Sequence, residues 1–488
     1  MRAPDDAGLR LAGLDAGTAG FSAGLAGLSV CVNGLGVSGP PVARALAVRG
    51  ARVTAVDARD DSDNRRLAAE LAGLGITVAL SPVPQLPAGT DLVITTPGWR
   101  PGTPLLTAAA AAGVPVIGDV ELAWRLRPVL AGGTRQEWLA VTGTNGKTTT
   151  VLMLAAMLSA AGQRSIAAGN VGLSIVDAVT EPEPYPVVAV ELSSFQLHWS
   201  STLRPLAAAV INVAAHHLDW HGDIDSYARD KGKIYAPGTI AVCNADDERS
   251  AALAAAAPAV ARVVPFRLGR PGPGELGVLG DDLIDRAFAD SARLASVSDV
   301  SPPAPHNVAD ALAAAALARA YGVPAAAIGA GLVSFRPQAH RISLVARVGG
   351  VDYIDDSKAS NPHAAAASLA AYPSVVWIAG GLFQGADGDL DALVGSVAPR
   401  LRAAVLLGAD RGRIRQALAR HAPDVPVVEA SGTDTGVMDL VVRQAAQLAM
   451  PGDTVLLAPA AQSFDMFRDY PARGDAFAAA VRRLAARP

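Results

Sequence analysis

One segment constrains the fold of this chain more than any other, namely residues 138–162, WLAVTGTNGKTTTVLMLAAMLSAAG. It opens with a short apolar run, Trp138 to Val141, that is typical of a buried parallel strand. A glycine-bearing loop follows, and then an Ala-, Leu- and Met-rich segment with high helix propensity. A strand, a glycine loop and a helix N-terminus form an anion site, because backbone N–H groups converge there and the helix dipole favours negative charge. The segment therefore predicts a phosphate-binding α/β core.

The loop in this segment is a shortened form of the P-loop pattern, since Val141 stands where the full pattern has its first glycine. In that pattern the lysine reaches the β- and γ-phosphates and the following hydroxyl binds Mg²⁺. A plain strand-to-helix turn with a surface lysine is the alternative. We expect ATP binding by the loop residues Gly143, Thr144, Asn145, Gly146, Lys147, Thr148 and Thr149.

Composition agrees with an α/β protein of several domains. A length of 488 residues suggests about three domains. The net charge of −4, with no basic tail, argues against an electrostatic nucleic-acid binder. No run of about 18 strongly apolar residues predicts a membrane span, and residues 1–25 lack signal-peptide order, so we expect a flexible extension there. Cys31 and Cys243 fall in expected strands and read as buried thiols, which favours a reducing cytoplasm.

The first 60 residues carry a dinucleotide-binding fingerprint. The expected strand Leu28 to Asn33 leads into Gly34-Leu-Gly36-Val-Ser-Gly39, and a second strand ends on Asp57. Taken alone, this pattern would favour a nicotinamide-dependent oxidoreductase. The same geometry serves other nucleotides, so the motif indicates only that a diphosphate or a ribose lies over this turn.

Polar residues follow the strands of the central segment. Glu191 ends an expected strand close to the phosphate loop and is well placed to hold Mg²⁺. Three histidines and an aspartate lie within residues 216–221, yet no cysteine and no H-E-x-x-H motif supports zinc, so a hard-cation role for one histidine is favoured. Lys231 and Lys233, on the expected helix Ser226 to Tyr235, read by default as solvated lysines.

The third segment repeats the pattern of apolar strands followed by polar loops, at residues 355–362, 380–387 and 459–465. The expected fold is α/β with three domains: a Rossmann-like N-terminal domain, a P-loop-type central ATPase domain and a Rossmann-like C-terminal domain. We place the boundaries at 26–117, 118–337 and 338–488.

The motifs together resemble the Mur ligases, the ATP-dependent amino-acid-adding enzymes of peptidoglycan synthesis, cell shape and cell division. The resemblance rests on TGTNGKTTT, ELSSFQL from 191, NVAAHHLDWHG from 212, YARDKGKIY from 227, HNVADALAA from 306 and HR at 340–341. DDSKASN, GGLFQGAD and PAAQSFDMF, together with the G-x-G-x-x-G first domain, favour the member that joins D-glutamate to UDP-N-acetylmuramoyl-L-alanine. The resemblance implies an acyl-phosphate intermediate and two Mg²⁺ ions. We expect a cytoplasmic monomer with no nucleic-acid partner and no membrane span.

Residue roles carry over by position. The resemblance implies metal ligation by Thr148, Glu191, His217 and Lys231, the last as a carbamate made from CO₂. An ammonium cannot ligate Mg²⁺, whereas a carbamate carries −1 and offers two oxygens, so the site should lower the lysine pKa to supply neutral amine. Lys147, Lys231, His217 and Lys358 are the implied catalytic residues, and Asn307, Asp310, Arg341 and Asp356 are implied further ATP contacts.

The same resemblance implies the two other substrate sites. The UDP-sugar would contact Gly34, Leu35, Gly36, Val37, Ser38, Asp57, Thr96, Pro97, Gly98 and Asn170. D-Glutamate would contact Lys358, Ser360, Gln384, Ser463 and Tyr470. Two positions depart from the family: Gln384 stands where members often carry lysine, and Asp310 stands where an adenine-contacting asparagine is often found.

Three alternatives stay open on the sequence alone. Another superfamily member, such as the ligase of the next wall step or a folate polyglutamate ligase, would share TGTNGKTTT. A nicotinamide oxidoreductase would leave Lys147, Glu191 and Lys231 without a role. An inactive nucleotide-binding homologue conflicts with the filled phosphate, metal and carbamate positions.

Overall fold

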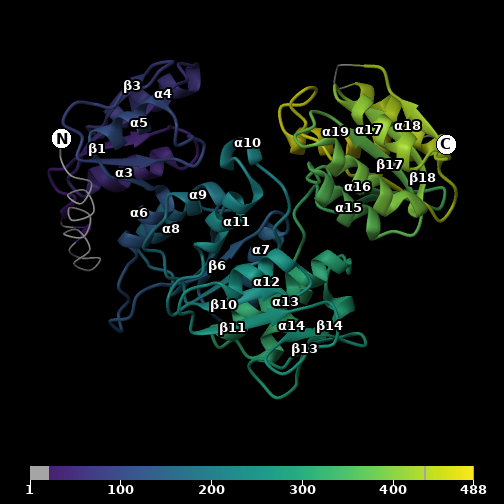
Figure 1. Ribbon diagram of the computed structural model, residues 1–488, viewed down its shortest axis with the longest axis horizontal. Helices are drawn as coiled ribbons and strands as arrows, with labels where there is room; N and C mark the ends of the chain where they lie inside the picture. Colours follow the sequence, from purple (N-terminus) through teal and green to yellow (C-terminus); the bar gives the residue numbers. More distant parts are fainter. Residues whose placement is uncertain (1–20, 23, 433–435, 487–488) are drawn as a thin grey trace. The chain divides into compact units, whose positions relative to one another are not determined.

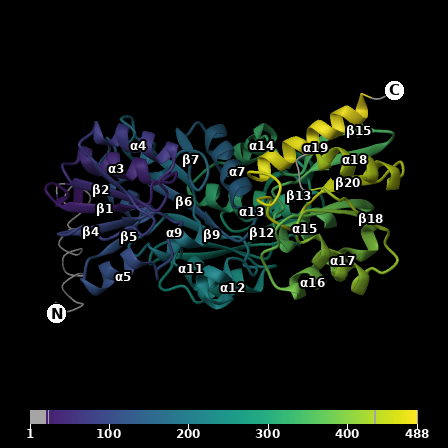
Figure 2. The ribbon, with the colours of Figure 1, turned by 90° about the horizontal axis from the view of Figure 1, so that it is seen from above.

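The computed structural model describes residues 21–22, 24–432 and 436–486. Within these residues the strands form three sheets flanked by helices (Figures 1 and 2). The first two sheets belong to one compact unit, which runs to Val300 and includes Val308–Phe335, and the third sheet belongs to a second unit, Ser301–Asn307 with the chain from Arg336 on. The expected α/β class, with two Rossmann-like parts around a P-loop-type part, is confirmed.

The first sheet is parallel and has the order β3-β2-β1-β4-β5. Two residues of the expected flexible extension, Phe21 and Leu25, are buried in the core beside this sheet, so that part of the expectation was wrong. Helix α3 begins at Gly39 with two prolines in its first turn, where a missing N–H costs nothing. The elements are β1 Ser29–Asn33, α3 Gly39–Val48, β2 Arg52–Asp57, α4 Ser62–Ala72, β3 Thr77–Leu80, β4 Leu92–Thr95, α5 Pro104–Ala111, β5 Val116–Gly118 and α6 Asp119–Leu126.

The second sheet has the order β14-β13-β12-β11-β10-β9-β6-β8-β7, with β6 next to β8 and β9. It is parallel except for the antiparallel pairs β12/β13 and β13/β14. Strand β6 contributes Trp138 and Ala140 to one buried cluster and Leu139 and Val141 to another, as expected for a parallel strand covered on both faces. The elements up to β10 are β6 Glu137–Thr142, α7 Lys147–Ala160, β7 Ser165–Gly169, α8 Ile175–Thr180, β8 Val187–Glu191, α9 Ser194–His198, β9 Ala207–Val210, α10 Leu218–His221, α11 Ile224–Gly232 and β10 Ile240–Asn244.

The rest of this part completes the sheet edge and covers one face. Helix α13 begins at Pro305, so His306 and Asn307 lie in its first turn. The remaining elements are α12 Glu248–Ala255, β11 Arg262–Phe266, β12 Leu276–Leu279, β13 Asp282–Asp285, β14 Ala292–Ser296, the 3₁₀ turn Val297–Asp299, α13 Pro305–Ala320 and α14 Ala325–Ser334.

The third sheet has the order β15-β16-β20-β17-β18-β19, and only β15 runs antiparallel to its neighbour. Helix α19 is capped by Asp469, whose carboxylate accepts from the N–H of Ala472 at 2.8 Å. The elements are β15 Ser343–Val348, β16 Val351–Asp355, α15 Pro362–Ala370, β17 Val375–Gly380, α16 Asp387–Val397, the 3₁₀ turn Ala398–Arg400, β18 Leu401–Leu407, α17 Arg411–His421, β19 Val427–Glu429, α18 Val437–Leu448, β20 Thr454–Leu457 and α19 Tyr470–Ala485.

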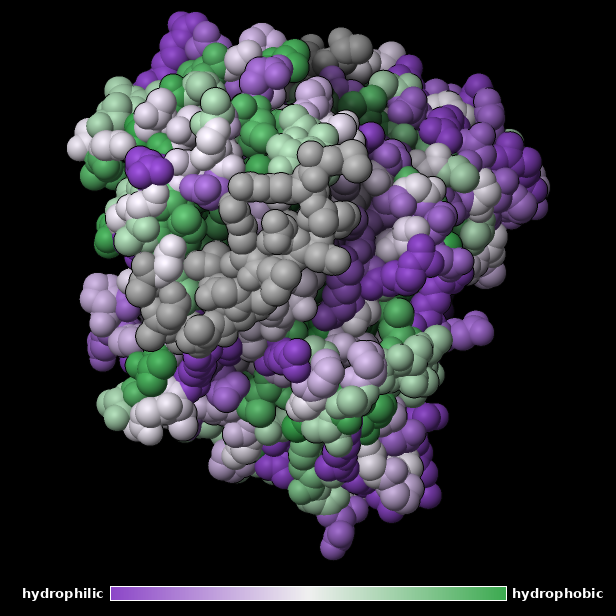
Figure 3. All heavy atoms as spheres, turned by 60° about the vertical axis from the view of Figure 1, so that its left-hand side comes forward, coloured by the Kyte–Doolittle hydropathy of each residue, from purple (hydrophilic) through white to green (hydrophobic). Residues whose placement is uncertain are grey.

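The surface mixes hydrophilic and hydrophobic residues, as Figure 3 shows for one face. No helix in the described part of the chain is long and apolar enough to cross a membrane.

Candidate active site

The phosphate loop joins β6 to α7 through a left-handed glycine. Gly146 has φ 83° and is the N-cap of α7, and a Cβ there would lie 2.3 Å from Oδ1 of Asp310. Glycine is therefore required twice, for its backbone conformation and for the close approach of α13. The carboxylate of Asp310 thus borders the phosphate loop itself.

Asn212, which follows β9, holds the loop through two backbone hydrogen bonds. Its Oδ1 accepts from the N–H groups of Thr144 at 3.0 Å and Asn145 at 2.9 Å. Lys147 folds over the loop, and its Nζ donates to the carbonyls of Gly143 at 3.0 Å and Thr144 at 2.9 Å. The loop is therefore braced by Lys147 from its own segment and by Asn212 from the segment after β9.

A hydroxyl and a carboxylate meet at the start of α7. Thr148 Oγ1 donates to Oε2 of Glu191 at 2.7 Å, and Oε1 of Glu191 accepts from Nδ2 of Asn170 at 3.0 Å. Glu191 is 2% exposed and ends β8, the strand next to β6. A buried carboxylate beside a hydroxyl is a hard-oxygen donor set of the kind that Mg²⁺ prefers.

Lys231 is buried beneath the phosphate loop, with 1% of its surface exposed. Its Nζ donates to the carbonyl of Gly143 at 2.7 Å and lies 4.5 Å from the centre of the Tyr227 ring. Burial and then the positive charge of Lys147 hold the pKa of Lys231 well below its usual value, against the pull of Glu191 and Asp230. A lowered pKa supplies the neutral amine that a carbamate requires.

The two adjacent histidines before α10 lie near the same lysines. His217, at φ 56°, is the N-cap of α10, and its ring is 3.8 Å from that of His216, centre to centre. Burial first, and then the charges of Lys147 and Lys231, lower the pKa of His217 to about 4. A neutral imidazole is the form that can ligate a metal. Among the described residues, no three His, Cys, Asp or Glu side chains are grouped so that they alone could hold a metal ion.

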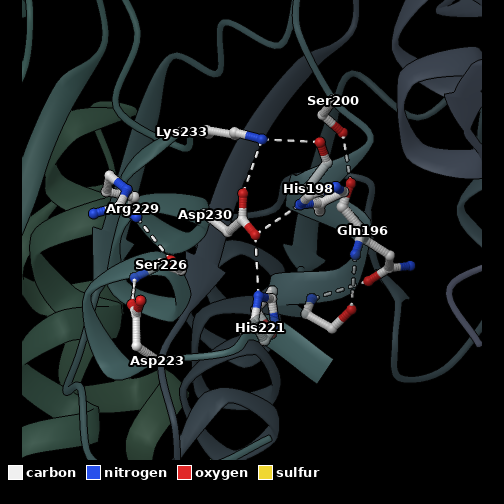
Figure 4. A network of polar contacts seen from close by, with 11 residues as sticks. Gln196, His198, Ser200, His221, Asp223, Ser226, Arg229, Asp230 and Lys233 are labelled. Atoms are coloured by element: carbon white, nitrogen blue, oxygen red, sulfur yellow. Dashed lines mark hydrogen bonds and ion pairs between the residues drawn. The ribbon is translucent and has the colours of Figure 1, made fainter. Parts of the chain in front are cut away.

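The side chain of Lys233 points toward Asp230, as Figure 4 shows. Its Nζ pairs with Oδ1 of Asp230 at 2.9 Å and donates to the carbonyl of His198 at 2.8 Å. Lys231 on α11 and Lys233 at its C-cap thus have different partners, and of the two it is Lys231 that contacts the loop.

The glycine loop after β1 is closed by residues from the two neighbouring strands. Gly34 has φ 108°, and a Cβ there would lie 2.2 Å from Oγ1 of Thr96. Oδ2 of Asp57 accepts from the N–H of Leu35 at 2.7 Å, so this carboxylate supports the loop backbone. Val37, at the tip of the loop, is 93% exposed, which leaves the tip open to a ligand. Asn170, expected on the sugar path, pairs with Glu191 on the phosphate side.

In the second unit, several expected residues gather around the loop after β16. Nζ of Lys358 lies 4.0 Å from the centre of the Tyr470 ring, and Ser463 is buried in the loop after β20. Asp356 accepts a hydrogen bond from Ser368, and burial raises the pKa of Asp356 to about 6. Gln384 lies on the exposed loop after β17.

Sequence reasoning missed Arg473, which connects this group. Its guanidinium, 1% exposed, donates to Oγ of Ser357 at 3.0 Å, to the carbonyl of Ser357 at 2.8 Å and to the carbonyl of Ala461 at 3.0 Å. Arg473 shares the apolar face of α19 with Phe477 and Val481. The position of Arg473 on the apolar face of an amphipathic helix is the sequence feature that could have indicated a buried arginine.

His340 is expected to make the stability of the second unit depend on pH. Its Nδ1 lies 2.6 Å from Oδ2 of Asp355, and this hydrogen bond raises the pKa of His340 above its usual value, against burial and with help from Asp355, Asp475 and Asp469. A raised folded-state pKa stabilises the protein fully below the unfolded pKa of about 6.5, and this contribution is lost as pH rises through the folded-state value. We expect urea unfolding to show a stability difference between wild type and His340→Gln that shrinks with rising pH. A difference independent of pH would contradict this.

The comparisons with known proteins agree with this geometry. Residues 141–318 match the family described as Mur ligase middle domain, and residues 340–461 match Mur ligase, glutamate ligase domain. The chain is 60% identical over 459 residues to the UDP-N-acetylmuramoylalanine–D-glutamate ligase of Thermobifida fusca, with 92% of this chain and 97% of that protein covered. The chain belongs to the Mur ligase family. The resemblance drawn from its motifs is confirmed, and with it an ATP-dependent ligase of peptidoglycan precursor synthesis.

This Mur ligase is also similar to a further curated relative and to solved structures. A UDP-N-acetylmuramoylalanine–D-glutamate ligase of Mycobacterium avium is 51% identical over 473 residues, covering 92% of this chain and 95% of that protein. Two solved structures share the fold at low identity. One is the UDP-N-acetylmuramate-alanine ligase of Thermotoga maritima, with a TM-score of 0.55, 20% identity and coverage of 94% and 100%. The other is a pseudomurein peptide ligase type C of Methanothermus fervidus, with a TM-score of 0.57, 17% identity and coverage of 94% and 100%.

Proposed function

We propose that this Mur ligase joins D-glutamate to UDP-N-acetylmuramoyl-L-alanine. The carboxylate of the L-alanyl group takes the γ-phosphoryl group of ATP, giving an acyl phosphate and ADP. The neutral amine of D-glutamate then attacks the acyl carbon, the amide bond forms, phosphate leaves and the amine releases a proton. The two substrates are those that the names of the relatives at 60% and 51% identity give.

The observation that carries the proposal is the arrangement beneath the phosphate loop. Thr148 and Glu191 lie in hydrogen-bonding contact, and the buried Lys231 reaches the carbonyl of Gly143. In phosphoryl transfer the protein contributes mainly positioning and charge neutralisation. The ammonium of Lys147 is the group in this loop that can move to the β- and γ-phosphates, and in this structure it donates to two loop carbonyls.

The residues present fit two Mg²⁺ ions and a carbamate on Lys231. Thr148 and Glu191 would hold the first ion, and His217 and the carbamate would ligate the second. The carbamate forms when the neutral amine of Lys231 attacks CO₂, so that an N–C bond is made and a proton leaves to solvent. Mg²⁺, when bound, neutralises negative charge on the transferring phosphoryl group.

The remaining roles are proposals from the family resemblance. The UDP-sugar would lie over Gly34 to Ser38, with Asp57 and Thr96 to Gly98 at its sides, and Asn170 would contact it from the central part. Further ATP contacts are proposed for the set Asn307, Asp310, Arg341 and Asp356, and D-glutamate contacts for the set Lys358, Ser360, Gln384, Ser463 and Tyr470. We also propose the three domains 26–117, 118–337 and 338–488, a monomer, and a place in the cytoplasm, where ATP is available.

Phosphate release from ATP tests the proposed reaction. The assay contains Mg²⁺ and UDP-N-acetylmuramoyl-L-alanine, and compares D-glutamate, L-glutamate and L-alanine as acceptors. Release with D-glutamate alone is the expected result. Phosphate release with another acceptor would leave the family assignment standing but contradict D-glutamate as the substrate. No release with any acceptor would contradict ligase activity.

Gln384 provides a prediction about substrate affinity. A lysine at this exposed loop position would offer a charge-assisted hydrogen bond to a glutamate carboxylate, whereas glutamine offers a neutral one. Gln384→Lys should lower the KM for D-glutamate by about tenfold, since a charged hydrogen bond adds roughly 1–2 kcal/mol. The KM for ATP is the internal control. A wild-type KM for D-glutamate in the variant would contradict the contact.

A further inference from the structure

Asp230 stands at the junction of three short helices, as Figure 4 shows. Its Oδ2 lies 2.8 Å from Nδ1 of His198, the last residue of α9, and 3.1 Å from Nδ1 of His221, the last residue of α10. Its Oδ1 pairs with Lys233. Asp230 is itself on α11 and is 7% exposed, so one buried carboxylate ties α9, α10 and α11 together.

His221 extends the connection to the start of α9. Its Nε2 lies 3.0 Å from Oγ of Ser194, the first residue of that helix. Because an ionised carboxylate only accepts, Nδ1 of the imidazole donates to Asp230 and Nε2 is left to accept from the serine hydroxyl. The ring therefore has a fixed tautomer and a fixed orientation between α9 and α11.

Each of the three tied helices adjoins a residue proposed to ligate metal. Glu191 comes three residues before Ser194, His217 is the N-cap of α10, and Lys231 follows Asp230 on α11. Between α10 and α11 the chain has only Gly222, at φ 86°, and Asp223. Such a glycine connection leaves the angle between the two helices to side-chain contacts, and the contact from His221 to Asp230 supplies one.

We propose that Asp230 is a positioning residue, which holds α9, α10 and α11 in the one arrangement that brings Glu191, His217 and Lys231 together for carbamylation and metal binding. The inference rests on the proposed function. Asp230 touches none of the reacting atoms in this assignment and acts through the helices that carry the ligands. Outer partners of metal ligands act in this way, and their loss costs about 10–100-fold in metal affinity or activity.

The test is the occupancy of the carbamate, read by ¹³C NMR of protein equilibrated with ¹³C-bicarbonate, with Lys231→Ala as the blank. Asp230→Asn should lose about tenfold in carbamate occupancy and in Mg²⁺ affinity. Asp225→Asn, an exposed acid on the same helix, is the matched control and should equal wild type. The Kd for UDP-N-acetylmuramoyl-L-alanine should stay unchanged in both variants, because the loop after β1 is braced by Asp57 and Thr96. Equal occupancy in the two variants, or an equal loss of UDP-sugar binding and carbamate in Asp230→Asn, would overturn the proposal.

A second pair of variants serves if Asp230→Asn does not fold. The side chain of His198 is 31% exposed, so its replacement leaves little buried space. In His198→Asn the side-chain amide lies two bonds beyond Cβ, as Nδ1 of the histidine does, so it can still donate to Asp230, and the carbamate on Lys231 should be retained. His198→Leu has no such donor and should lose the carbamate. Equal occupancy in this pair would overturn the proposal.

The proposed function is tested separately by D-glutamate-dependent phosphate release from wild type. Release without a wild-type carbamate signal would leave the reaction standing and overturn the inference about Asp230. If release is absent but the carbamate is present, the substrate assignment fails, and the variant pairs still decide the role of Asp230.

Discussion

Replacing Lys231 by alanine should lower kcat by about 10²–10³-fold, the usual cost of removing one electrostatic group from an active site. Lys231 is buried against the carbonyl of Gly143, and its surroundings hold its pKa well below the usual value, so it is not a surface lysine. The alanine variant can form no carbamate and loses the oxygens proposed to ligate the second metal ion. Steady-state phosphate release, with ATP and D-glutamate varied in turn, measures the effect.

Lys233→Ala is the control for this prediction. Its side chain is 39% exposed and pairs with Asp230 and the carbonyl of His198, not with the phosphate loop, so kcat should fall by no more than a few fold. Wild-type kcat in Lys231→Ala would contradict the assignment of the carbamate to this lysine.

Replacing Arg473 by methionine should lower the free energy of unfolding by about 3 kcal/mol, because two buried carbonyls and a hydroxyl lose their donors at roughly 1–3 kcal/mol for each unsatisfied group, and relief of the buried charge offsets part of the loss. The guanidinium joins the loop after β16 to the loop after β20, so these loops should also loosen. Lys358, which follows Ser357, should then bind D-glutamate more weakly. Urea unfolding and the KM for D-glutamate are the two measurements.

Arg482→Met provides the control on the same helix, since Arg482 is exposed on α19. A substitution there should change stability by less than about 0.5 kcal/mol. Equal stability of the two variants would show that the contacts of Arg473 carry no net stabilisation.

The strands that position the site could be predicted from the sequence because they are short apolar runs that end at glycines or polar residues. Strand β1 differs from its predicted bounds, Leu28 to Asn33, by one residue, and β6 extends the predicted apolar run, Trp138 to Val141, by one residue at each end. The antiparallel strands β12, β13 and β14 were not predicted. They are four or five residues long and mix polar and apolar positions at a sheet edge, so neither periodicity nor burial marks them in the sequence.

Some residues of the site could likewise be predicted from the sequence, and others could not. Residues at the ends of parallel strands, such as Glu191 and Asp57, could be predicted, because those ends meet at one edge of the sheet. The contacts of Asp230 could not, since His198, His221 and Asp230 come from three helices whose packing is a tertiary property. Arg473 was missed because periodicity assigns a charged residue to solvent, whereas tertiary contacts with loop carbonyls retain it in the interior.

When a nucleotide binds at the phosphate loop, the ammonium of Lys147 must exchange its hydrogen-bond acceptors. The ammonium of Lys147 already has two acceptors in the loop, the carbonyls of Gly143 and Thr144, and a phosphate must displace them. The loop carbonyls therefore compete with the phosphates of ATP for the Lys147 ammonium. The measured affinity for ATP reflects the difference between the hydrogen bonds to the phosphates and those to the carbonyls. In return, the lysine side chain is ordered before the nucleotide arrives, so less conformational entropy is lost when it turns to the phosphates.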